Sequence, residues 1–200
     1  MFCDENGKDL PLVVAVSKTQ PIEVIQEAID IGITHFGENY AQELDQKAEK
    51  FPEKNWHFIG TIQSRHLRNI IHHAQYIHSL QRLKIAKLLA KNSYSGKLFI
   101  EINISGEQTK SGLGFNSATV KNFLTQIHDL KLNVAGFMGI GDYDWDHEKS
   151  LSNFRKLVDM GNNFGFTEFS LGMSADWREA VLAGSTVVRI GTEIFGPRQY

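Results

Sequence analysis

Three things that the sequence lacks exclude whole classes of protein. It has a single cysteine, Cys3, so it can form neither an internal disulfide nor a CxxC-type zinc site, which favours a reducing compartment. It lacks an excess of positive charge, since the formal net charge is −2 at pH 7, whereas a nucleic-acid-binding protein needs a basic face. It also lacks any apolar run near the ~20 residues of a membrane span, and residues 1–11 are too polar for a secretion signal. We therefore expect a cytoplasmic protein with neither a membrane nor a nucleic acid as partner.

What the sequence does contain is a regular alternation of strand-like and helix-like segments. Eight short apolar segments read as strands, at residues 12–17, 34–36, 56–60, 76–80, 97–104, 132–140, 166–171 and 186–190. Seven segments with helical periodicity separate them, at residues 21–31, 41–51, 66–74, 82–90, 120–130, 151–160 and 176–182. Helical returns require parallel strands, and eight such units close into a (β/α)₈ TIM barrel. We predict one domain over residues 1–200, with an open doubly wound sheet as the alternative.

The carboxyl-terminal end departs from an ordinary barrel. Only nine residues follow Gly191, so no room remains for an eighth helix after the last predicted strand. Residues 1–11 are too short and too polar to replace it. An uncovered groove leaves apolar side chains exposed, and we expect a monomer or weak self-association.

The first candidate for chemistry is Lys18, at the tip of the first predicted strand. Apolar residues precede it, and Pro21 opens the next helix. Poor hydration lowers the pKa of an amine and makes it a candidate Schiff-base nucleophile. A surface lysine that merely ends a strand is the alternative.

Two glycine-containing loops offer a place for a phosphate group. Residues 172–176 follow the seventh strand and lead into a helix, and residues 189–196 follow the eighth strand. In barrels of this kind, phosphate often binds at these two loops. Each loop alone could be an ordinary helix cap. Both loops together, facing a strand-tip lysine, describe a site for pyridoxal 5′-phosphate (PLP).

Several segments carry a resemblance to a known family. They are residues 15–19, 36–43, 56–60, 103–105 with 110–112, 172–176 and 188–196. In this order they resemble the YggS/PROSC family of PLP-binding proteins, also called PLP homeostasis proteins, from about residue 12 to the end. The sequence departs from the family at Gln81, at residues 64–66, at Gly141 and in its missing or shortened N-terminal helix.

The resemblance implies a barrel like the N-terminal domain of alanine racemase, which is PLP fold type III. It implies that Lys18 holds PLP as an internal aldimine and that Arg189 faces the pyridine nitrogen. It further implies that Ser174, with the backbone of Gly191 and Thr192, holds the phosphate. Asn39 would lie near the ring.

The resemblance also implies a role in intracellular PLP, vitamin B6 and amino-acid homeostasis without established catalysis, with PLP-dependent apoenzymes as recipients. The alternative is a PLP-dependent amino-acid racemase or decarboxylase of the same fold type, and a more distant one is a Schiff-base aldolase. Such racemases usually carry a second domain, for which no residues remain. We expect no metal site, and we interpret His72 and His73 as a solvated pair.

Overall fold

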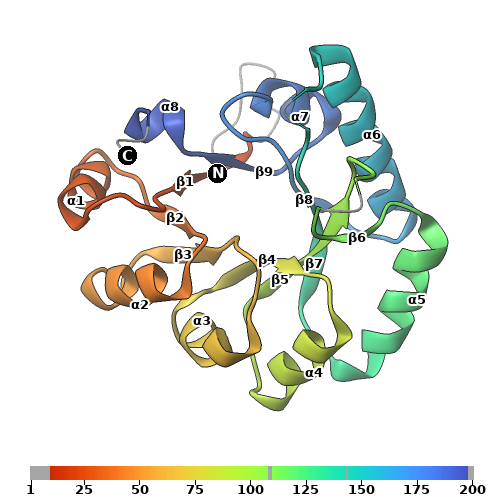
Figure 1. Cartoon of the computed structure of the whole chain (residues 1–200), viewed down its shortest axis with the longest axis horizontal. Coiled ribbons are helices and arrows are strands. Elements are labelled where there is room, and N and C mark those ends of the chain that lie inside the picture. Colours follow the sequence, from red (N-terminus) through yellow and green to blue (C-terminus); the bar gives the residue numbers. More distant parts are fainter. Residues whose placement is uncertain (1–9, 108–109, 143, 198–200) are drawn as a thin grey trace.

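Eight parallel strands close into a barrel in the computed structural model, which describes residues 10–107, 110–142 and 144–197 (Figure 1). The barrel strands are β1 (Leu12–Val16), β2 (His35–Glu38), β3 (Asn55–Phe58), β4 (Tyr76–Leu80), β5 (Lys97–Asn103), β7 (Val134–Gly139), β8 (Glu168–Ser170) and β9 (Val187–Ile190). Their order is β4-β3-β2-β1-β9-β8-β7-β5, and the pairing of β4 with β5 closes the ring. The predicted TIM barrel is confirmed. A two-residue strand that was not predicted, β6 (Leu113–Gly114), pairs with the end of β5.

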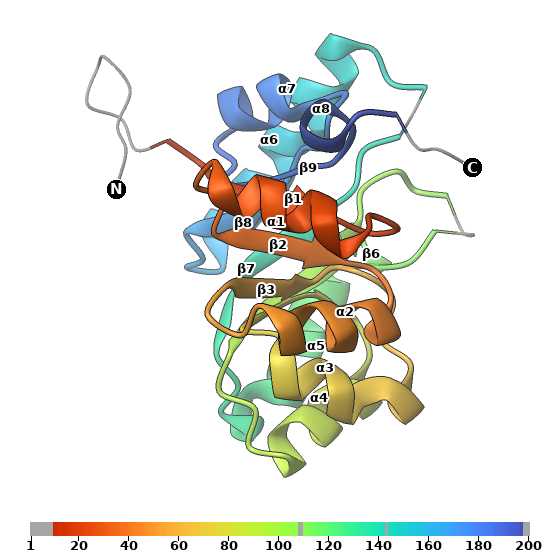
Figure 2. The same cartoon turned by 90° about the vertical axis from the view of Figure 1, so that its left-hand side faces the viewer.

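The helices form the outer layer of the molecule. They are α1 (Ile22–Asp30), α2 (Ala41–Lys50), α3 (Leu67–His73), α4 (Leu83–Lys91), α5 (Ser117–Ile127), α6 (His147–Asn163), α7 (Trp177–Ala183) and α8 (Thr192–Phe195). Figure 1 shows them around the barrel, and Figure 2 shows α1, α2 and α3 covering the outside of the first strands. This arrangement leaves the two ends of the barrel to the loops.

Two of the helices begin where a side chain caps them. Asp146 accepts a hydrogen bond from the N–H of Lys149, and Asn116 accepts one from the N–H of Thr119. The Asp146 cap starts α6 at His147, four residues before the start predicted at residue 151. The first turn of α6 is polar, and for this reason the apolar periodicity did not reveal it.

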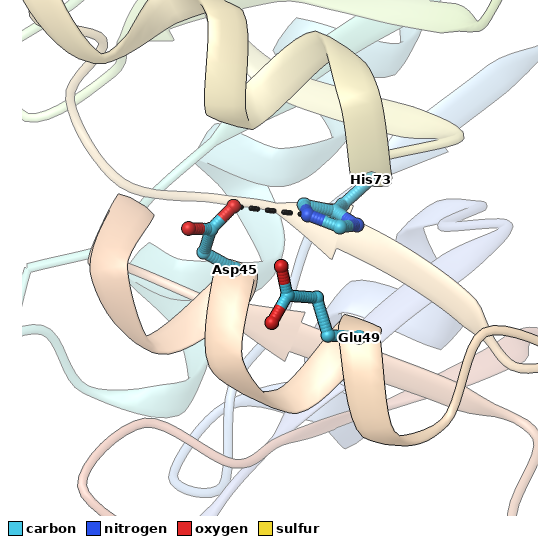
Figure 3. A group of neighbouring side chains, drawn as sticks. All are labelled: Asp45, Glu49 and His73. Atoms are coloured by element: carbon cyan, nitrogen blue, oxygen red, sulfur yellow. Dashed lines mark hydrogen bonds and ion pairs between the residues drawn. The ribbon is translucent and has the colours of Figure 1, made fainter.

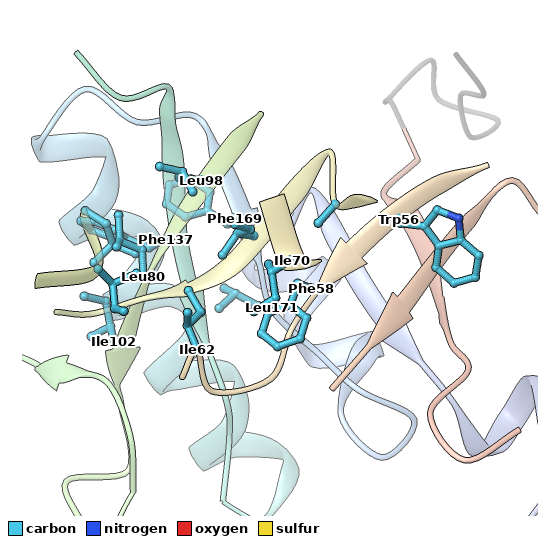
Figure 4. Close-up of a cluster of buried hydrophobic side chains, with 14 of the residues drawn as sticks. Trp56, Phe58, Ile62, Ile70, Leu80, Leu98, Ile102, Phe137, Phe169 and Leu171 are labelled. Atoms are coloured by element: carbon cyan, nitrogen blue, oxygen red, sulfur yellow. The ribbon is translucent and has the colours of Figure 1, made fainter. Parts of the chain in front are cut away.

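Alternation along each strand divides the buried side chains into two sets. In β3, Trp56 and Phe58 are almost fully buried in the large apolar layer between sheet and helices, part of which Figure 4 shows. His57, between them, therefore points to the inside of the barrel. A small apolar cluster is also present, made by Val14, Phe99, Met138 and Val187. Polar side chains make up much of the rest of the interior.

One prediction about the end of the chain is wrong. The structure places a four-residue helix, α8, directly after β9, where the sequence left room for none. A single turn needs only the residues up to Phe195 and is too short to produce a periodic pattern. The prediction that residues 1–11 cannot replace an eighth helix concerns mostly residues 1–9, which lie outside the described residues.

We predict that Gly136→Ala destabilises the protein strongly. Its Cβ would lie 1.7 Å from the carbonyl oxygen of Glu168 on the paired strand, and backbone cannot move aside without breaking the sheet. We expect the free energy of unfolding to fall by ~3 kcal/mol, measured by urea denaturation. The matched control is Gly114→Ala, whose Cβ would come no nearer than 3.3 Å, to the flexible side chain of Asn116. Equal losses in both variants would contradict this account.

Candidate functional site

The six residues predicted to bind the cofactor all follow, or lie near the ends of, four strands. Lys18 follows β1, Asn39 follows β2 and Ser174 follows β8, while Arg189 lies in β9 with Gly191 and Thr192 just after it. These strands are neighbours, in the order β2-β1-β9-β8. Because parallel strands end at the same side of the barrel, the structure gathers the six residues along one part of its rim.

The two predicted phosphate loops touch each other. The N–H of Gly191 donates a hydrogen bond to Oγ of Ser174 over 3.3 Å. A Cβ on Gly191 would lie 3.5 Å from the carbonyl oxygen of Val16, so the loop after β9 also lies against the end of β1. Thr192 opens α8 and is exposed. The structure thus brings the hydroxyl of Ser174 and backbone N–H groups of the loop after β9 together beside Val16, which precedes Lys18 by two residues.

Arg189 is the buried member of this group, because it lies one residue before the end of β9 and its side chain contacts the ends of β7 and β8. Its Nη1 donates to the carbonyl oxygen of Ser170 at 2.5 Å and to Oγ of Ser170 at 2.6 Å, and its Nη2 donates to the carbonyl oxygen of Gly139 at 2.9 Å. Burial lowers its pKa to about 10, against the effect of Asp176 and Glu101, which raise it. Arg189 therefore keeps its positive charge at neutral pH.

A buried ion-pair network supports the backbone on both sides of Lys18. The ammonium of Lys47 donates to the carbonyl oxygen of Ser17, to Glu38 and to Glu43, each at 2.7 Å. Glu43 also accepts the N–H of Thr19 at 2.7 Å. Thr19 has a φ of +64°, which is uncommon for a residue other than glycine. The network thereby fixes the residues that flank Lys18 in an otherwise unfavourable turn.

Glu38 is the most deeply placed member of this network. It has no exposed surface, and its Oε1 accepts hydrogen bonds from Ser17 and Lys47 at 2.7 Å. Within the described residues its Oε2 has no partner. Burial raises the pKa of Glu38 to about 7, although Lys47 and the Ser17 hydroxyl act in the opposite direction.

Asn39 is the one predicted residue that lines a described cavity. Its Oδ1 is buried and accepts no hydrogen bond from the part of the chain that the structure describes. The cavity has a volume of about 120 Å³. A larger cavity of about 600 Å³ lies beside Ser174 and is lined by its neighbours Met173 and Ala175. Neither cavity is lined by Lys18 or Arg189, so the six residues share the rim without sharing one of these cavities.

The departure from the family at Gln81 has a local explanation. The side-chain amide of Gln81 donates to Glu101 at 2.9 Å and accepts the N–H of Gly112 at 2.7 Å. A carboxylate at this position could accept from Gly112 but could not donate to Glu101. Ser111 donates to the other oxygen of Glu101.

The interpretation of His73 as a solvated residue is wrong. Its Nε2 lies 2.9 Å from Oδ1 of Asp45, and its side chain is only 10% exposed. Asp45, Glu49 and His73 bring three possible metal ligands within 4.8 Å of one another on α2 and α3 (Figure 3). The second oxygen of Asp45 accepts from Asn69 at 3.0 Å. Since both oxygens of Asp45 have protein partners, we assign the group as a hydrogen-bonded contact between the helices.

Sequence reasoning missed Glu38 and Lys47 as supports of the site, and His57, His78 and Ser170 as polar residues of the barrel interior. A signal was available for His57, His78 and Ser170. Each is polar and directly follows an apolar core residue in a strand, as His57 follows Trp56. In a half-buried strand that pattern is ordinary, but in a parallel barrel both faces are buried. A polar residue there therefore needs a partner.

Comparisons with known proteins agree with the fold of this chain. The model of the alanine racemase N-terminal domain family matches residues 11–199. A pyridoxal phosphate homeostasis protein of Vibrio alginolyticus is 41% identical over 94% of this chain and 87% of its own. The structure of PipY of Synechococcus elongatus with PLP bound is 29% identical, with a TM-score of 0.84, over 93% of this chain and 92% of that one.

A more distant structure shares the fold alone. Alanine racemase of Bacillus anthracis is 16% identical, with a TM-score of 0.76, over 95% of this chain and 52% of that one. No helix in the described part of the chain is long and apolar enough to cross a membrane.

We predict that Glu38 makes the protein less stable as the pH rises. Its pKa is about 7 in the folded protein, against an ordinary value of 4.5, so between these values the folded state binds more protons than the unfolded chain. The free energy of unfolding then falls with rising pH across this window. Glu38→Gln removes the titration, and we expect the variant to gain ~1–3 kcal/mol relative to the parent between pH 5 and 7.5.

Urea denaturation at a series of pH values measures this difference. The control is Glu27→Gln, an exposed glutamate on α1, which should follow the parent at every pH. If the Glu38→Gln curve runs parallel to that of the parent, Glu38 does not titrate in this range.

Proposed function

Because this chain belongs to the family of pyridoxal phosphate homeostasis proteins, we propose that it binds PLP at the rim formed by β1, β2, β8 and β9. PLP binding and a role in PLP homeostasis follow from the family, and the assignment of residues is our proposal. The observation that carries this proposal is the hydrogen bond between Gly191 and Ser174. It lies beside Val16 at the end of β1, and Lys18 is two residues further along the chain.

The donor set of this rim fits an anionic phosphate. It offers the hydroxyl of Ser174 and the N–H of Thr192, which has no acceptor within the helix that it opens. The N–H of Gly191 donates to that hydroxyl and would turn to the phosphate when it binds. Apart from its chain neighbours, a Cβ on Gly191 would lie near Val16 alone, at 3.5 and 3.6 Å, so the backbone of this loop can be approached closely at that point. Hydrogen bonds to a charged acceptor are worth ~1.5–3 kcal/mol each.

The other end of the cofactor would lie between Lys18 and Arg189. When bound, PLP supplies an aldehyde that condenses with an amine, and Lys18 is the amine at the end of β1. Arg189 would face the ring nitrogen, and its permanent charge disfavours a proton there. Asn39, whose Oδ1 lacks a partner among the described residues, would lie beside the ring.

The same family assignment favours a protein without catalysis. The curated relatives are named for homeostasis and not for a reaction. The racemase alternative rests on proteins that share only the fold with this chain. This chain covers about half of their length, for example 52% of the Bacillus anthracis enzyme. Three expectations stay predictions: delivery of PLP to apoenzymes, a monomeric or weakly associating chain, and a cytoplasmic location.

We predict that Lys18→Ala abolishes covalent binding of PLP. The parent, mixed with PLP, should show the visible absorption of a Schiff base and, after borohydride reduction, a mass adduct on the peptide containing Lys18. Both signals should be lost in the variant, while far-ultraviolet circular dichroism stays that of the parent. Lys87→Ala on α4 is the control and should keep both signals. An adduct that persists in Lys18→Ala would move the site to another lysine.

We predict that Ser174→Ala weakens PLP but not pyridoxal. Removing one hydrogen bond to the phosphate should raise the Kd of PLP roughly ten- to a hundredfold. Pyridoxal has no phosphate, and its Kd should change by less than about twofold. Titrations followed by absorption give both values. Equal losses for the two ligands would show that Ser174 does not contact the phosphate.

A further inference from the structure

A chain of hydrogen bonds crosses the inside of the barrel and ends at Arg189. Nδ1 of His35 lies 2.9 Å from Nε2 of His57, and Nδ1 of His57 lies 2.9 Å from Nε2 of His78. Nδ1 of His78 lies 2.8 Å from Oγ of Ser170, to which Nη1 of Arg189 donates at 2.6 Å. The chain thus joins four side chains from β2, β3, β4 and β8 to the arginine of β9.

This chain takes the place of apolar packing. The inside of a (β/α)₈ barrel is usually filled by branched aliphatic side chains. Here His57, His78 and Ser170 have no exposed surface, and Ser170 stands between the core residues Phe169 and Leu171. Burying polar groups is costly unless they are hydrogen-bonded, so the chain stabilises the fold only while all of its links are made.

The two inner histidines are neutral. Burial and the proximity of His78 and His35 hold the pKa of His57 well below its usual range. Burial and the charge of Arg189 do the same to His78. A neutral imidazole has one N–H and one acceptor nitrogen, so each inner ring must donate to one neighbour and accept from the other.

This requirement gives the whole chain a single direction. In the first direction, Ser170 donates to Nδ1 of His78, and every imidazole carries its proton on Nε2. In the second, every imidazole carries its proton on Nδ1, and His78 donates to Ser170. No link can reverse alone, because one ring would then meet its neighbour with two donors or two acceptors.

The direction decides what Ser170 can do for Arg189. In the first direction, Oγ of Ser170 donates to His78 and has lone pairs for Arg189. In the second, the same oxygen accepts from His78 and from Arg189 together, and its own proton must turn to another acceptor. The second direction therefore changes the hydrogen bonding that holds the guanidinium.

The direction can be set at the other end, by His35. Its side chain is half-buried at the start of β2, and burial alone lowers its pKa. A protonated His35 has N–H groups on both nitrogens and cannot accept from His57. One proton taken up from solvent at His35 therefore selects the second direction, while each inner ring keeps one proton and moves it from Nε2 to Nδ1.

The groups that face the chain are few. Tyr76 of β4 stacks on His57 with ring centroids 4.1 Å apart and meets His35 edge-on at 5.9 Å. Lys97 of β5, in register with Tyr76, is paired with Glu168 at 2.6 Å. On the Arg189 side, the facing charges are Asp176 and Glu101.

We propose that His35, His57, His78 and Ser170 are positioning residues for Arg189, acting as one directional hydrogen-bond chain whose direction is set by the protonation of His35. The effect on cofactor binding rests on the proposed function, whereas the chain itself does not. It makes the hydrogen bonding of Arg189 sensitive to protonation of His35 at the other end of the hydrogen-bond chain.

The first test uses the cofactor-free protein with ¹⁵N-labelled imidazoles. As the pH falls from 8 to 5, the proton of each of His57 and His78 should move from Nε2 to Nδ1. The ¹⁵N chemical shifts of the two nitrogens in each ring should therefore swap, with the same midpoint pH as the titration of His35. His35→Gln should abolish that exchange, and His128→Gln, at an exposed residue, should leave it unchanged. Inner rings that keep one tautomer while His35 of the parent titrates would overturn the proposal.

The second test measures the Kd of PLP over the same pH range. We expect it to rise about two- to tenfold on the acid side of the His35 midpoint in the parent and in His128→Gln, but not in His35→Gln. A Kd of PLP that stays constant over the pH range in which the tautomers change would overturn the positioning role. Failure of PLP to bind at any pH would instead overturn the proposed function. The first test would still show whether the hydrogen-bond chain has a single direction set by His35, because it uses cofactor-free protein.

Discussion

Parallel pairing of all eight barrel strands is the constraint on which the rest of this structure depends. Each strand pairs in parallel with both neighbours, through to the closing pair of β4 and β5. Every strand therefore ends on the same side, and residues far apart in the sequence meet there. Ser174 and Gly191 are 17 positions apart and Thr19 and Glu43 are 24 apart, yet each pair is joined by a hydrogen bond. The site owes its position to this pairing rather than to any local motif.

Parallel pairing also buries both faces of each strand, and the two faces hold different side chains. The outer face packs an almost wholly apolar layer under the helices, in which Trp56 and Phe36 have ring centroids 5.4 Å apart. The inner face has few apolar residues and is crossed by imidazoles. Stability can therefore rest on the outer layer, and the interior can contain hydrogen bonds that extend to the site.

Most of the fold could be predicted because buried strands and amphipathic helices have strong local signals. The fourth strand was predicted at residues 76–80 and lies at Tyr76–Leu80. Elements without such a signal were missed, namely the single turn of α8, the two residues of β6 and the polar first turn of α6. The six candidate site residues came from loop chemistry and a family resemblance, and the structure places them along one part of the rim. Their supports were missed because Glu38 reaches Ser17 across 21 positions and His78 reaches Ser170 across 92.

Two polar networks approach the rim from different directions. One, made by Lys47 with Glu38 and Glu43, holds the backbone around Lys18 from the helix side of the barrel. The other holds Arg189 from inside the barrel. The two networks act on different groups, namely the backbone beside Lys18 and the guanidinium of Arg189, and they reach the rim from opposite faces of the barrel wall. A change in one network therefore acts first on its own part of the site.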